Sequence, residues 1–237
     1  MQALIEQGED LILPNDDPAV EIVKGYRRFI VGQDIAQARD RNAYTILLDE
    51  RVPFYDENGR QELGKRRREI VRAAHLPHMS YTDLAQVTKN LMMDPAIAGR
   101  AYLCVDQSGV GRAYCDLLDA KSVLHTRVTM TASEGENEVK ERGLTLNNVG
   151  RNRLLSLLNS AIHTGDLTIG NFPARDLMRQ ELESFEAEVG SSGRVRIEGK
   201  TSFGHNDLVV SAALALWLSD HRTIGAHVGV SPLAGYW

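Results

Sequence analysis

The chain has little of several features that mark particular protein classes. Its 237 residues include only two cysteines, Cys104 and Cys115, so we expect reduced, structural thiols rather than a disulfide framework. No apolar run is long enough to span a membrane, because the longest, residues 208–218, is interrupted by Ser211. The acidic first 17 residues lack the basic and apolar regions of a signal peptide. The sequence therefore predicts an ordinary globular protein of a cytoplasm-like compartment.

Excess positive charge is also missing. The formal net charge is −5, so the field of the whole chain does not indicate nucleic-acid binding. Local basic groups are nevertheless present, and the candidate phosphate contacts are Lys65, Arg66, Arg67, Arg68, Arg151 and Arg153. Such groups are also found on solvated faces, so both interpretations stay open.

Two familiar motifs are incomplete. Residues 199–201 resemble the end of a phosphate-binding loop, but Arg194 stands where that loop needs glycine, so the sequence contains no ATPase motif. His75 and His78 lack the cysteine or histidine partners of a zinc site, and a surface or packing role is favoured for both.

The pattern along the chain predicts alternating strands and helices. Strands are expected over 27–34, 43–52, 101–106, 124–131, 167–169 and 194–198, and helices over 80–93, from about 111, and over 149–163, 174–187 and 206–219. Residues 66–75 suit either a helix or a third strand, and residues 134–138 a loop or hairpin. This order predicts an α/β protein with a mixed sheet and helices packed on it.

The same pattern divides the chain into three segments. Residues 1–25 are interpreted as a linker or N-terminal extension, 26–220 as the folded domain, and 221–237 as an irregular tail.

Three separated carboxylates mark the points where elements end or begin. Asp34 and Asp106 each close an apolar strand, and Asp207 precedes the long apolar helix. Each alone also suits a turn or helix-capping role. Together they predict a shared site, because crowded carboxylates repel and are stabilised by hard cations such as Mg²⁺ or Mn²⁺. A pair of such ions is the usual device for hydrolysing phosphodiesters, so the sequence predicts a metal-dependent nuclease.

The ordered motifs resemble the nuclease domain of the large terminase subunit of tailed bacteriophages, over residues 26–220. The resemblance is carried by Val31-Gly32-Gln33-Asp34-Ile35-Ala36 with Asp40 and Thr45, by Val105-Asp106-Gln107-Ser108-Gly109-Val110-Gly111, and by His205-Asn206-Asp207-Leu208-Val209. Residues 128–131, 152–155 and 167–169 match in order and spacing. The resemblance implies a ribonuclease H-like fold, a mixed central sheet flanked by helices.

The resemblance also implies a site for two Mg²⁺ or Mn²⁺ ions. In this hypothesis Asp34 bridges the ions, and Asp106 and Asp207 each complete one coordination shell. His205 is a catalytic candidate for proton transfer or phosphate contact, with a structural role as the alternative, and Asp40 is an auxiliary candidate. The family often has an acid where this chain has Asn206, whose amide supplies an oxygen ligand without charge.

The implied substrate is double-stranded DNA, cut with little sequence preference during genome packaging in the cytoplasm of a bacterial host. Implied partners are a phage portal, a small terminase subunit and an ATPase domain. The alternatives are a catalytically decayed module that docks to a packaging motor, and a junction resolvase or transposase of the same fold.

Overall fold

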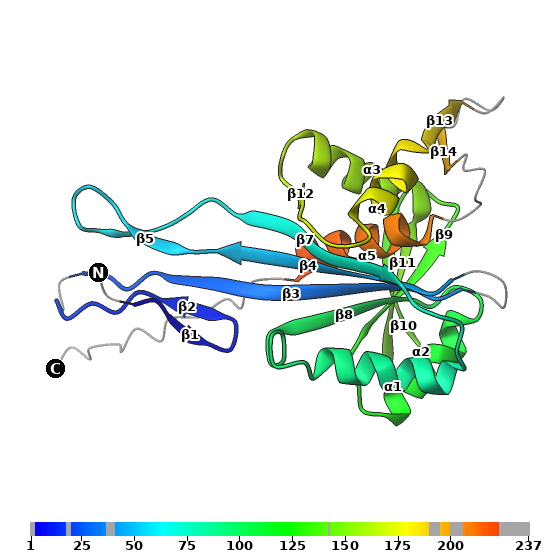
Figure 1. The fold of residues 1–237 in the computed structure, drawn as a ribbon, viewed down its shortest axis with the longest axis horizontal. Coiled ribbons are helices and arrows are strands. Elements are labelled where there is room, and N and C mark those ends of the chain that lie inside the picture. Colours follow the sequence, from blue (N-terminus) through cyan, green and yellow to red (C-terminus); the bar gives the residue numbers. More distant parts are fainter. Residues whose placement is uncertain are drawn as a thin grey trace, which may run out of the picture.

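A mixed sheet of ten strands runs through the molecule (Figure 1). The computed structural model describes residues 3–17, 20–36, 41–141, 143–189, 195–199 and 206–222. The strands of the sheet are β1 (Ile5–Gln7), β2 (Asp10–Ile12), β3 (Lys24–Asp34), β4 (Ala43–Arg51), β7 (Arg67–His75), β8 (Ala101–Asp106), β9 (Thr126–Thr131), β10 (Glu136–Glu141), β11 (Leu144–Gly150) and β12 (Thr168–Ile169). Separate hairpins are formed by β5 (Pro53–Tyr55) with β6 (Gln61–Leu63) and by β13 (Phe185–Val189) with β14 (Val195–Gly199).

Most strands of the sheet point the same way. Its main path has the order β10-β11-β9-β8-β3-β4-β7-β12. β3 is parallel to β8, and parallel pairing continues through β9 to β11. β4 is antiparallel to both β3 and β7, so β7 has the direction of β3. The C-terminal ends of β3, β7, β8, β9 and β11 therefore lie along one border of the sheet, which we call the carboxyl edge.

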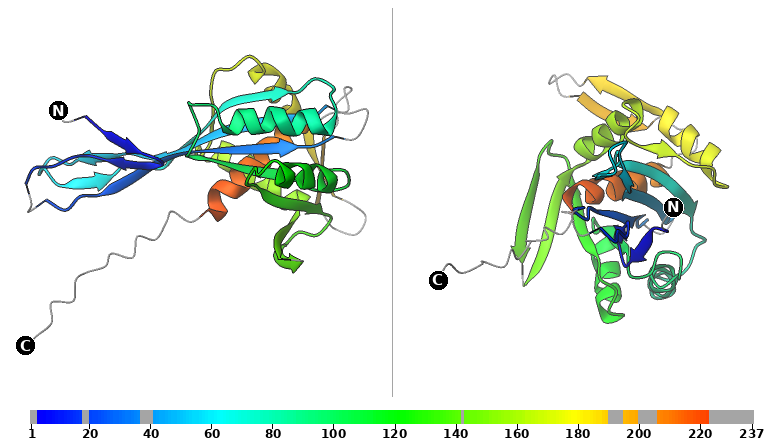
Figure 2. Two further views of the ribbon diagram at one scale, coloured as in Figure 1. Left: turned by 90° about the horizontal axis from the view of Figure 1, so that it is seen from below. Right: turned by 90° about the vertical axis from the view of Figure 1, so that its left-hand side faces the viewer.

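Helices cover both faces of the sheet. α1 (Tyr81–Met92) and α2 (Gly111–Ala120) lie on one face, and α3 (Arg151–His163), α4 (Arg175–Glu183) and α5 (Asp207–His221) lie on the other (Figure 1 and Figure 2). Alternation along β3 supplies both cores, because Ile30 packs with α3, α4 and α5 whereas Val31 packs with α1 and α2. None of the helices in the described part of the chain combines the length and apolar character needed to cross a bilayer.

α5 is the central helix of its layer. Residues 208–219 are all buried, which matches a sequence that is apolar on every side. The helix lies against β3 and β4 and also packs on α3. It therefore links the sheet to the outer helices, and its N-terminus is held in a fixed position.

Several sequence predictions are confirmed. The segment with two possible forms, residues 66–75, is strand β7 over most of its length. The helix expected at 80–93 is α1, and the Ser80 hydroxyl accepts the N–H of Asp83 at 3.1 Å as an N-cap. β8 has the predicted bounds, and the segment after 134 forms the hairpin of β10 and β11.

Two segments differ from the sequence prediction. The helix expected to reach residue 187 ends at Glu183, where the Ser184 hydroxyl donates to the carbonyl oxygen of Glu181 at 2.6 Å, and β13 follows. Residues 5–12 form the hairpin of β1 and β2, and β2 pairs with β3. That part of the expected N-terminal extension is therefore joined to the sheet.

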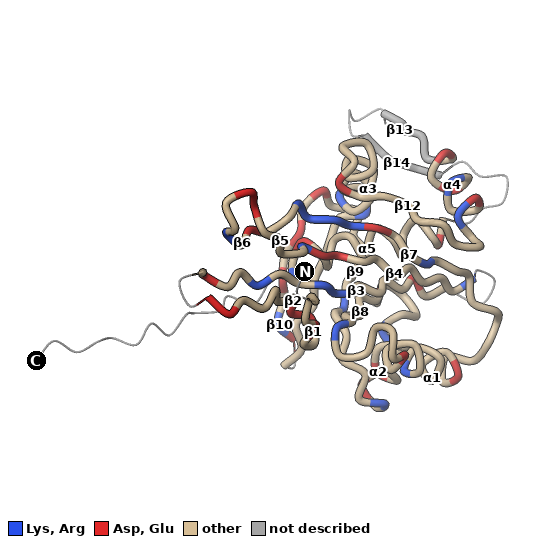
Figure 3. The backbone as a smooth tube through the Cα atoms, turned by 60° about the vertical axis from the view of Figure 1, so that its left-hand side comes forward, with Lys and Arg blue, Asp and Glu red and all other residues tan. Residues whose placement is uncertain are grey.

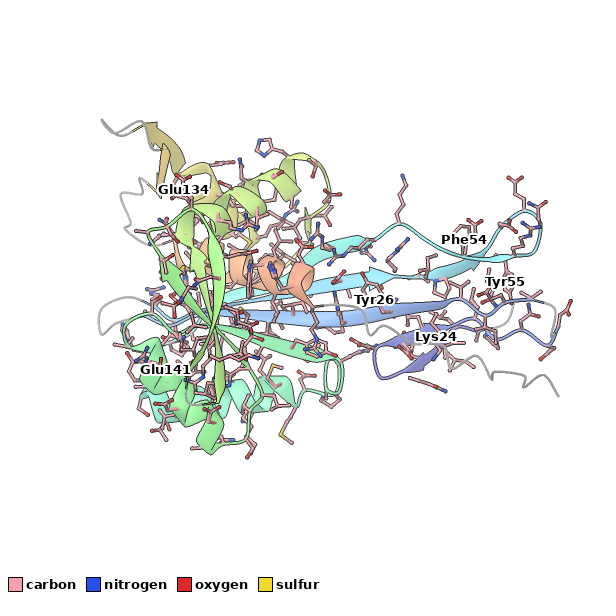
Figure 4. The ribbon with its side chains drawn as sticks, turned by 180° about the vertical axis from the view of Figure 1, so that it is seen from behind. Lys24, Tyr26, Phe54, Tyr55, Glu134 and Glu141 are labelled. Atoms are coloured by element: carbon pink, nitrogen blue, oxygen red, sulfur yellow. The ribbon has the colours of Figure 1, made fainter. Side chains whose placement is uncertain are left out.

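An arm of strands projects from the body of the molecule (Figure 1 and Figure 2). It consists of the first half of β3, the end of β4, β2 and the β5–β6 hairpin, with Phe54 and Tyr55 toward its far end (Figure 4). Gln61 joins its layers, since its amide donates to the carbonyl oxygen of Leu13 at 2.8 Å and accepts the N–H of Val23 at 2.9 Å. The arm lies at the opposite end of β3 from the carboxyl edge.

Candidate functional site

Asp34 and Asp106 end neighbouring parallel strands at the carboxyl edge. The register pairs Gln33 of β3 with Val105 of β8, so the two carboxylates follow one step later, on strands about 5 Å apart. Both side chains have the same parity as core residues that face α5, Ile30 on β3 and Cys104 on β8. The structure therefore brings these two predicted residues together on one face of the sheet.

The third predicted carboxylate comes from α5, which crosses the sheet close to Asp34. Gly32 is required there, because an added Cβ would lie 1.9 Å from the carbonyl oxygen of Ser211. Thr45, the partner of Gly32 on β4, bonds the Ser211 hydroxyl with its own at 2.7 Å. These contacts fix the start of the second turn of α5 beside Gly32, two residues before the end of β3, and Asp207 begins the same helix one turn earlier.

Asp106 is a buried carboxylate with 5% of its surface exposed. Its Oδ1 accepts the N–H of Ser108 at 2.8 Å. Burial raises the pKa of the Asp106 carboxyl, and hydrogen bonds from Ser108 and the charge of Arg151 offset only part of that rise. The following turn is tight, since a Cβ on Gly111 would lie 2.0 Å from the carbonyl oxygen of Asp106. A cation beside this carboxylate would favour its charged form.

Two residues that the sequence analysis did not assign to this site, His75 and Glu181, lie beside Asp207. His75 ends β7 at the carboxyl edge, and its Nε2 lies 3.5 Å from Glu181 Oε1 and 3.9 Å from Asp207 Oδ2. Burial, together with the nearby charge of Asp207, raises the pKa of Glu181 to about 7, although backbone N–H groups of α5 lower it in part. No local signal marks Glu181, and strand alternation would not have marked His75, because an irregularity in the pairing of β7 with β4 places both Ile70 and Ala73 on the face of α5.

The remaining predicted ligands differ in what can be described. Asn206 is the N-cap residue of α5, and its Oδ1 is buried with no hydrogen-bond partner among the described residues. His205 and Asp40 lie outside the described residues. Their predicted roles therefore stay predictions.

The donor set fits a hard divalent cation in its chemistry. All of the proposed ligands are oxygen donors, the type that Mg²⁺ and Mn²⁺ prefer. They are the carboxylates of Asp34, Asp106 and Asp207 and the buried amide oxygen of Asn206. Within the described ranges, no group of three or more His, Cys, Asp or Glu side chains is arranged to hold an ion. Convergence of all three carboxylates on one ion pair therefore remains a prediction.

The basic cluster at residues 65–68 lies at the start of β7, the opposite end of that strand from the carboxyl edge. Its ion pairs join Arg66 to Asp49 (2.8 Å) and Asp220 (2.9 Å), Arg67 to Glu50 (3.0 Å), and Arg68 to Asp220 (2.8 Å). Asp220 is in the last turn of α5, about 20 Å along the helix from Asp207. Figure 3 shows the cluster as a blue stretch leading into β7, with red acidic residues beside it.

Arg151 and Arg153 both belong to the first turn of α3 but have different surroundings. The charge of Arg151 acts on Asp106, so this guanidinium lies near the carboxyl edge. Arg153 is held by Glu136 of β10 through two hydrogen bonds of 3.1 Å. Among the predicted DNA contacts, Arg151 is therefore the one that the structure brings near the carboxylates.

Nuclease domains of phage large terminases are among the solved structures with a similar fold. No protein-family model matches the sequence, and no curated protein matches it. The magnesium-bound large terminase nuclease of thermophilic phage G20c is 21% identical, with a TM-score of 0.55 over 92% of this chain and 91% of that one. The cobalt-bound form of that nuclease gives a TM-score of 0.54 at 21% identity, over 92% and 91% of the two chains. The large terminase nuclease domain of Thermus phage P74-26 gives 0.53 at 20% identity, over 91% and 88%.

These similarities define the class of fold. The chain has a ribonuclease H-like mixed sheet flanked by helices, which confirms the predicted fold class. More narrowly, it shares the fold of the nuclease domains of phage large terminases.

Proposed function

We propose that this chain is a divalent-metal-dependent endonuclease that cuts double-stranded DNA with little sequence preference during phage genome packaging. One observation carries the proposal: Asp34 and Asp106 end adjacent parallel strands on the face where α5 begins with Asp207. Its support from outside the chain is the fold shared with large terminase nuclease domains, one of them solved with bound magnesium.

In this proposal the carboxylates of Asp34, Asp106 and Asp207 hold the ions, and Asn206 adds a neutral oxygen. Two divalent ions, when bound, supply activation of the attacking water and stabilisation of the leaving oxygen. The N–H of Ser108 holds the buried carboxylate of Asp106 in place, so this ligand is positioned before an ion binds. The bridging role of Asp34, and any role of His205 or Asp40, are part of the same proposal.

DNA contact is assigned to Arg151 first. Its charge reaches Asp106, so a phosphate bound there would lie beside the proposed ions. The cluster at residues 65–68 is a second candidate, but Arg66 and Arg68 already make ion pairs with acidic side chains. A phosphate would have to compete with those carboxylates.

The proposed context is a packaging motor in the cytoplasm of a bacterial host. Its other components would be an ATPase domain, a portal and a small terminase subunit. The support for this context is the fold, which the chain shares with large terminase nucleases.

The test is cleavage of linear and supercoiled duplex DNA by the purified chain in EDTA, Mg²⁺ or Mn²⁺. We expect cleavage with Mg²⁺ and more with Mn²⁺, which is less dependent on ideal octahedral geometry. Asp34→Asn should abolish cleavage while the chain stays folded. Asp176→Asn, an exposed carboxylate in the first turn of α4, is the matched control and should cut at the wild-type rate.

Other outcomes would favour the alternatives. A chain that binds no metal and cuts no DNA would indicate a docking module of the same fold. Cleavage confined to four-way junctions would indicate a resolvase.

A further inference from the structure

The N-terminus of α5 is capped by a residue from a different helix. Asn206 occupies the N-cap position but makes no side-chain cap hydrogen bond. Instead, Oε2 of Glu181 accepts the N–H of Leu208 at 3.0 Å and that of Val209 at 3.3 Å. These are the second and third N–H groups of the helix, which an N-cap asparagine usually satisfies itself.

Glu181 is well suited to this task. It lies in the last turn of α4, where an acid gains nothing from its own helix, because the C-terminal end of a helix is partially negative. Only 3% of its surface is exposed, so its carboxylate depends on the two N–H groups of α5 and on nearby His75. The positive end of α5 therefore stabilises a buried acid that comes from α4.

The consequence is found at Asn206. Its Oδ1 is buried and has no hydrogen-bond partner among the described residues, although this oxygen ordinarily caps the helix. The oxygen belongs to the residue next to Asp207, one of the three proposed ligands. A neutral amide oxygen in this situation is a suitable donor for a hard cation.

We propose that Glu181 is a positioning residue of the metal site: by capping α5 it leaves the side-chain oxygen of Asn206 available to a divalent ion held with Asp207. This inference rests on the proposed metal-dependent function. Without Glu181, the Asn206 side chain turns to cap its own helix, and the ion loses an oxygen ligand. The helix itself remains, because asparagine is among the best N-cap residues.

The experiment measures Mn²⁺ binding to the whole chain by calorimetry and by electron paramagnetic resonance, without DNA. We expect Glu181→Ala to weaken Mn²⁺ binding by about ten- to a hundredfold, the usual effect of removing a residue that orients a ligand. Glu181→Gln keeps an oxygen that accepts the two N–H groups, and should bind Mn²⁺ nearly as the wild type does. Glu183→Ala, an exposed acid in the same helix, is the matched control and should be unchanged.

A second substitution separates positioning from a merely structural role. Asn206→Asp should strengthen Mn²⁺ binding in the wild-type background, because it adds a charge to an available ligand. In the Glu181→Ala background the new Asp is drawn into the cap, so most of that gain should be lost. Equal gains in both backgrounds would overturn the inference. If Glu181→Ala does not fold, Glu181→Asp, one methylene shorter, replaces it in the same comparison.

The outcomes also separate this inference from the proposed function. Wild-type binding of Mn²⁺ with cleavage, together with unchanged binding in Glu181→Ala, would overturn only the role of Glu181. A wild-type chain that binds no Mn²⁺ and cuts no DNA would overturn both.

Discussion

The two ends of α5 both gather buried carboxylates, yet they do so in opposite ways. At the C-terminal end, Asp49 is completely buried and receives hydrogen bonds from Arg28 and Arg66, at 2.8–2.9 Å. At the N-terminal end, Glu181 and Asp106 are also buried, but their hydrogen bonds come from backbone N–H groups of α5 and of Ser108. One end holds its acids with guanidinium groups, and the other end mainly with dipoles.

The pKa shifts follow this difference. Burial alone would raise the pKa of Asp49, but the hydrogen bonds and charges of Arg66 and Arg28 outweigh it and lower the pKa. Burial raises the pKa of Asp106 and of Glu181, because the donors around them offset it only in part. The comparison teaches that similar burial has opposite effects on the pKa, depending on whether guanidinium groups donate hydrogen bonds to the acid. Buried acids without guanidinium hydrogen bonds at a strand edge are the ones to test for a functional cation.

The largest expected effect is that of replacing Asp106, which tests whether the acids near the N-terminal end of α5 are functional rather than structural. Asp106→Asn should lower the rate of DNA cleavage by more than about a hundredfold, since loss of a ligand should exceed the loss from a residue that only orients one. The folded chain should be as stable as the wild type in EDTA at neutral pH, or more stable, because burial disfavours the charged carboxyl. The measurements are initial cleavage rates and urea unfolding. Parallel loss of activity and stability would show that Asp106 belongs with Asp49 as a structural acid.

At the other end the expected effect is on stability. Asp49→Ala leaves Arg28 buried without its carboxylate and should reduce the free energy of unfolding by about 3–5 kcal/mol. Cleavage per folded molecule should be unchanged, because the last turn of α5 is about 20 Å from Asp207. Urea unfolding measures the loss, with Asp176→Ala as the exposed control. A loss below about 1 kcal/mol would place Asp49 among surface ion pairs.

Local sequence patterns predicted much of the site at the N-terminal end of α5. Asp34 and Asp106 could be assigned to strand ends because apolar runs stop at each, and parallel strands bring such ends to the same edge. The long apolar run after Asp207 predicted the buried helix α5. The α/β class followed from the order of these elements, and the ribonuclease H-like fold followed from the resemblance to terminase nuclease domains.

The features that could not be predicted from the sequence depend on contacts between residues far apart in the chain. The cap on α5 joins Glu181 to Leu208 across 27 positions, and no periodicity within α4 marks it. His75 was obscured because its segment suited either a helix or a strand. The end of α4 was placed too late, since β13 is defined by its pairing with β14 and not by a local signal. The guanidinium partners of Asp49 also come from other strands and loops, so the basic cluster resembled a free patch in sequence.

Glu136, an acid that contacts the C-terminal end of α5 through Trp217 and His221, sharpens the comparison through pH. Burial would raise the pKa of Glu136, but hydrogen bonds from Trp217 (2.9 Å), Arg153 (3.1 Å) and His221 (3.1 Å) lower it to about 2. A lowered carboxyl pKa adds stability above the ordinary value of 4.5, and this stability is lost as pH falls from there toward 2. Glu136→Gln should therefore cost about 1 kcal/mol near pH 6 and almost nothing near pH 2.

Urea unfolding of both proteins across that pH range measures the difference. Glu141, at the other end of β10, is exposed, so Glu141→Gln is the matched control. Figure 4 shows Glu141 well separated from Glu134, which precedes the strand. A cost for Glu136→Gln that is independent of pH would mean that shape rather than charge holds this contact.

The smallest expected effect concerns which end of α5 meets DNA. Arg151→Ala should weaken binding to a DNA duplex a few-fold and reduce the slope of log affinity against log salt by about 1, the effect of one lost phosphate contact. Lys65→Ala, in the basic cluster near the C-terminal end of α5, is the control and should leave the slope unchanged. Fluorescence anisotropy with a labelled duplex, without divalent metal, measures both slopes. Lys65 avoids the ambiguity of its neighbours, because replacing Arg66 would also break the buried pair with Asp49. If Lys65→Ala lowers the slope and Arg151→Ala does not, the DNA path runs along the basic cluster, and Arg151 serves only to balance the charge of Asp106.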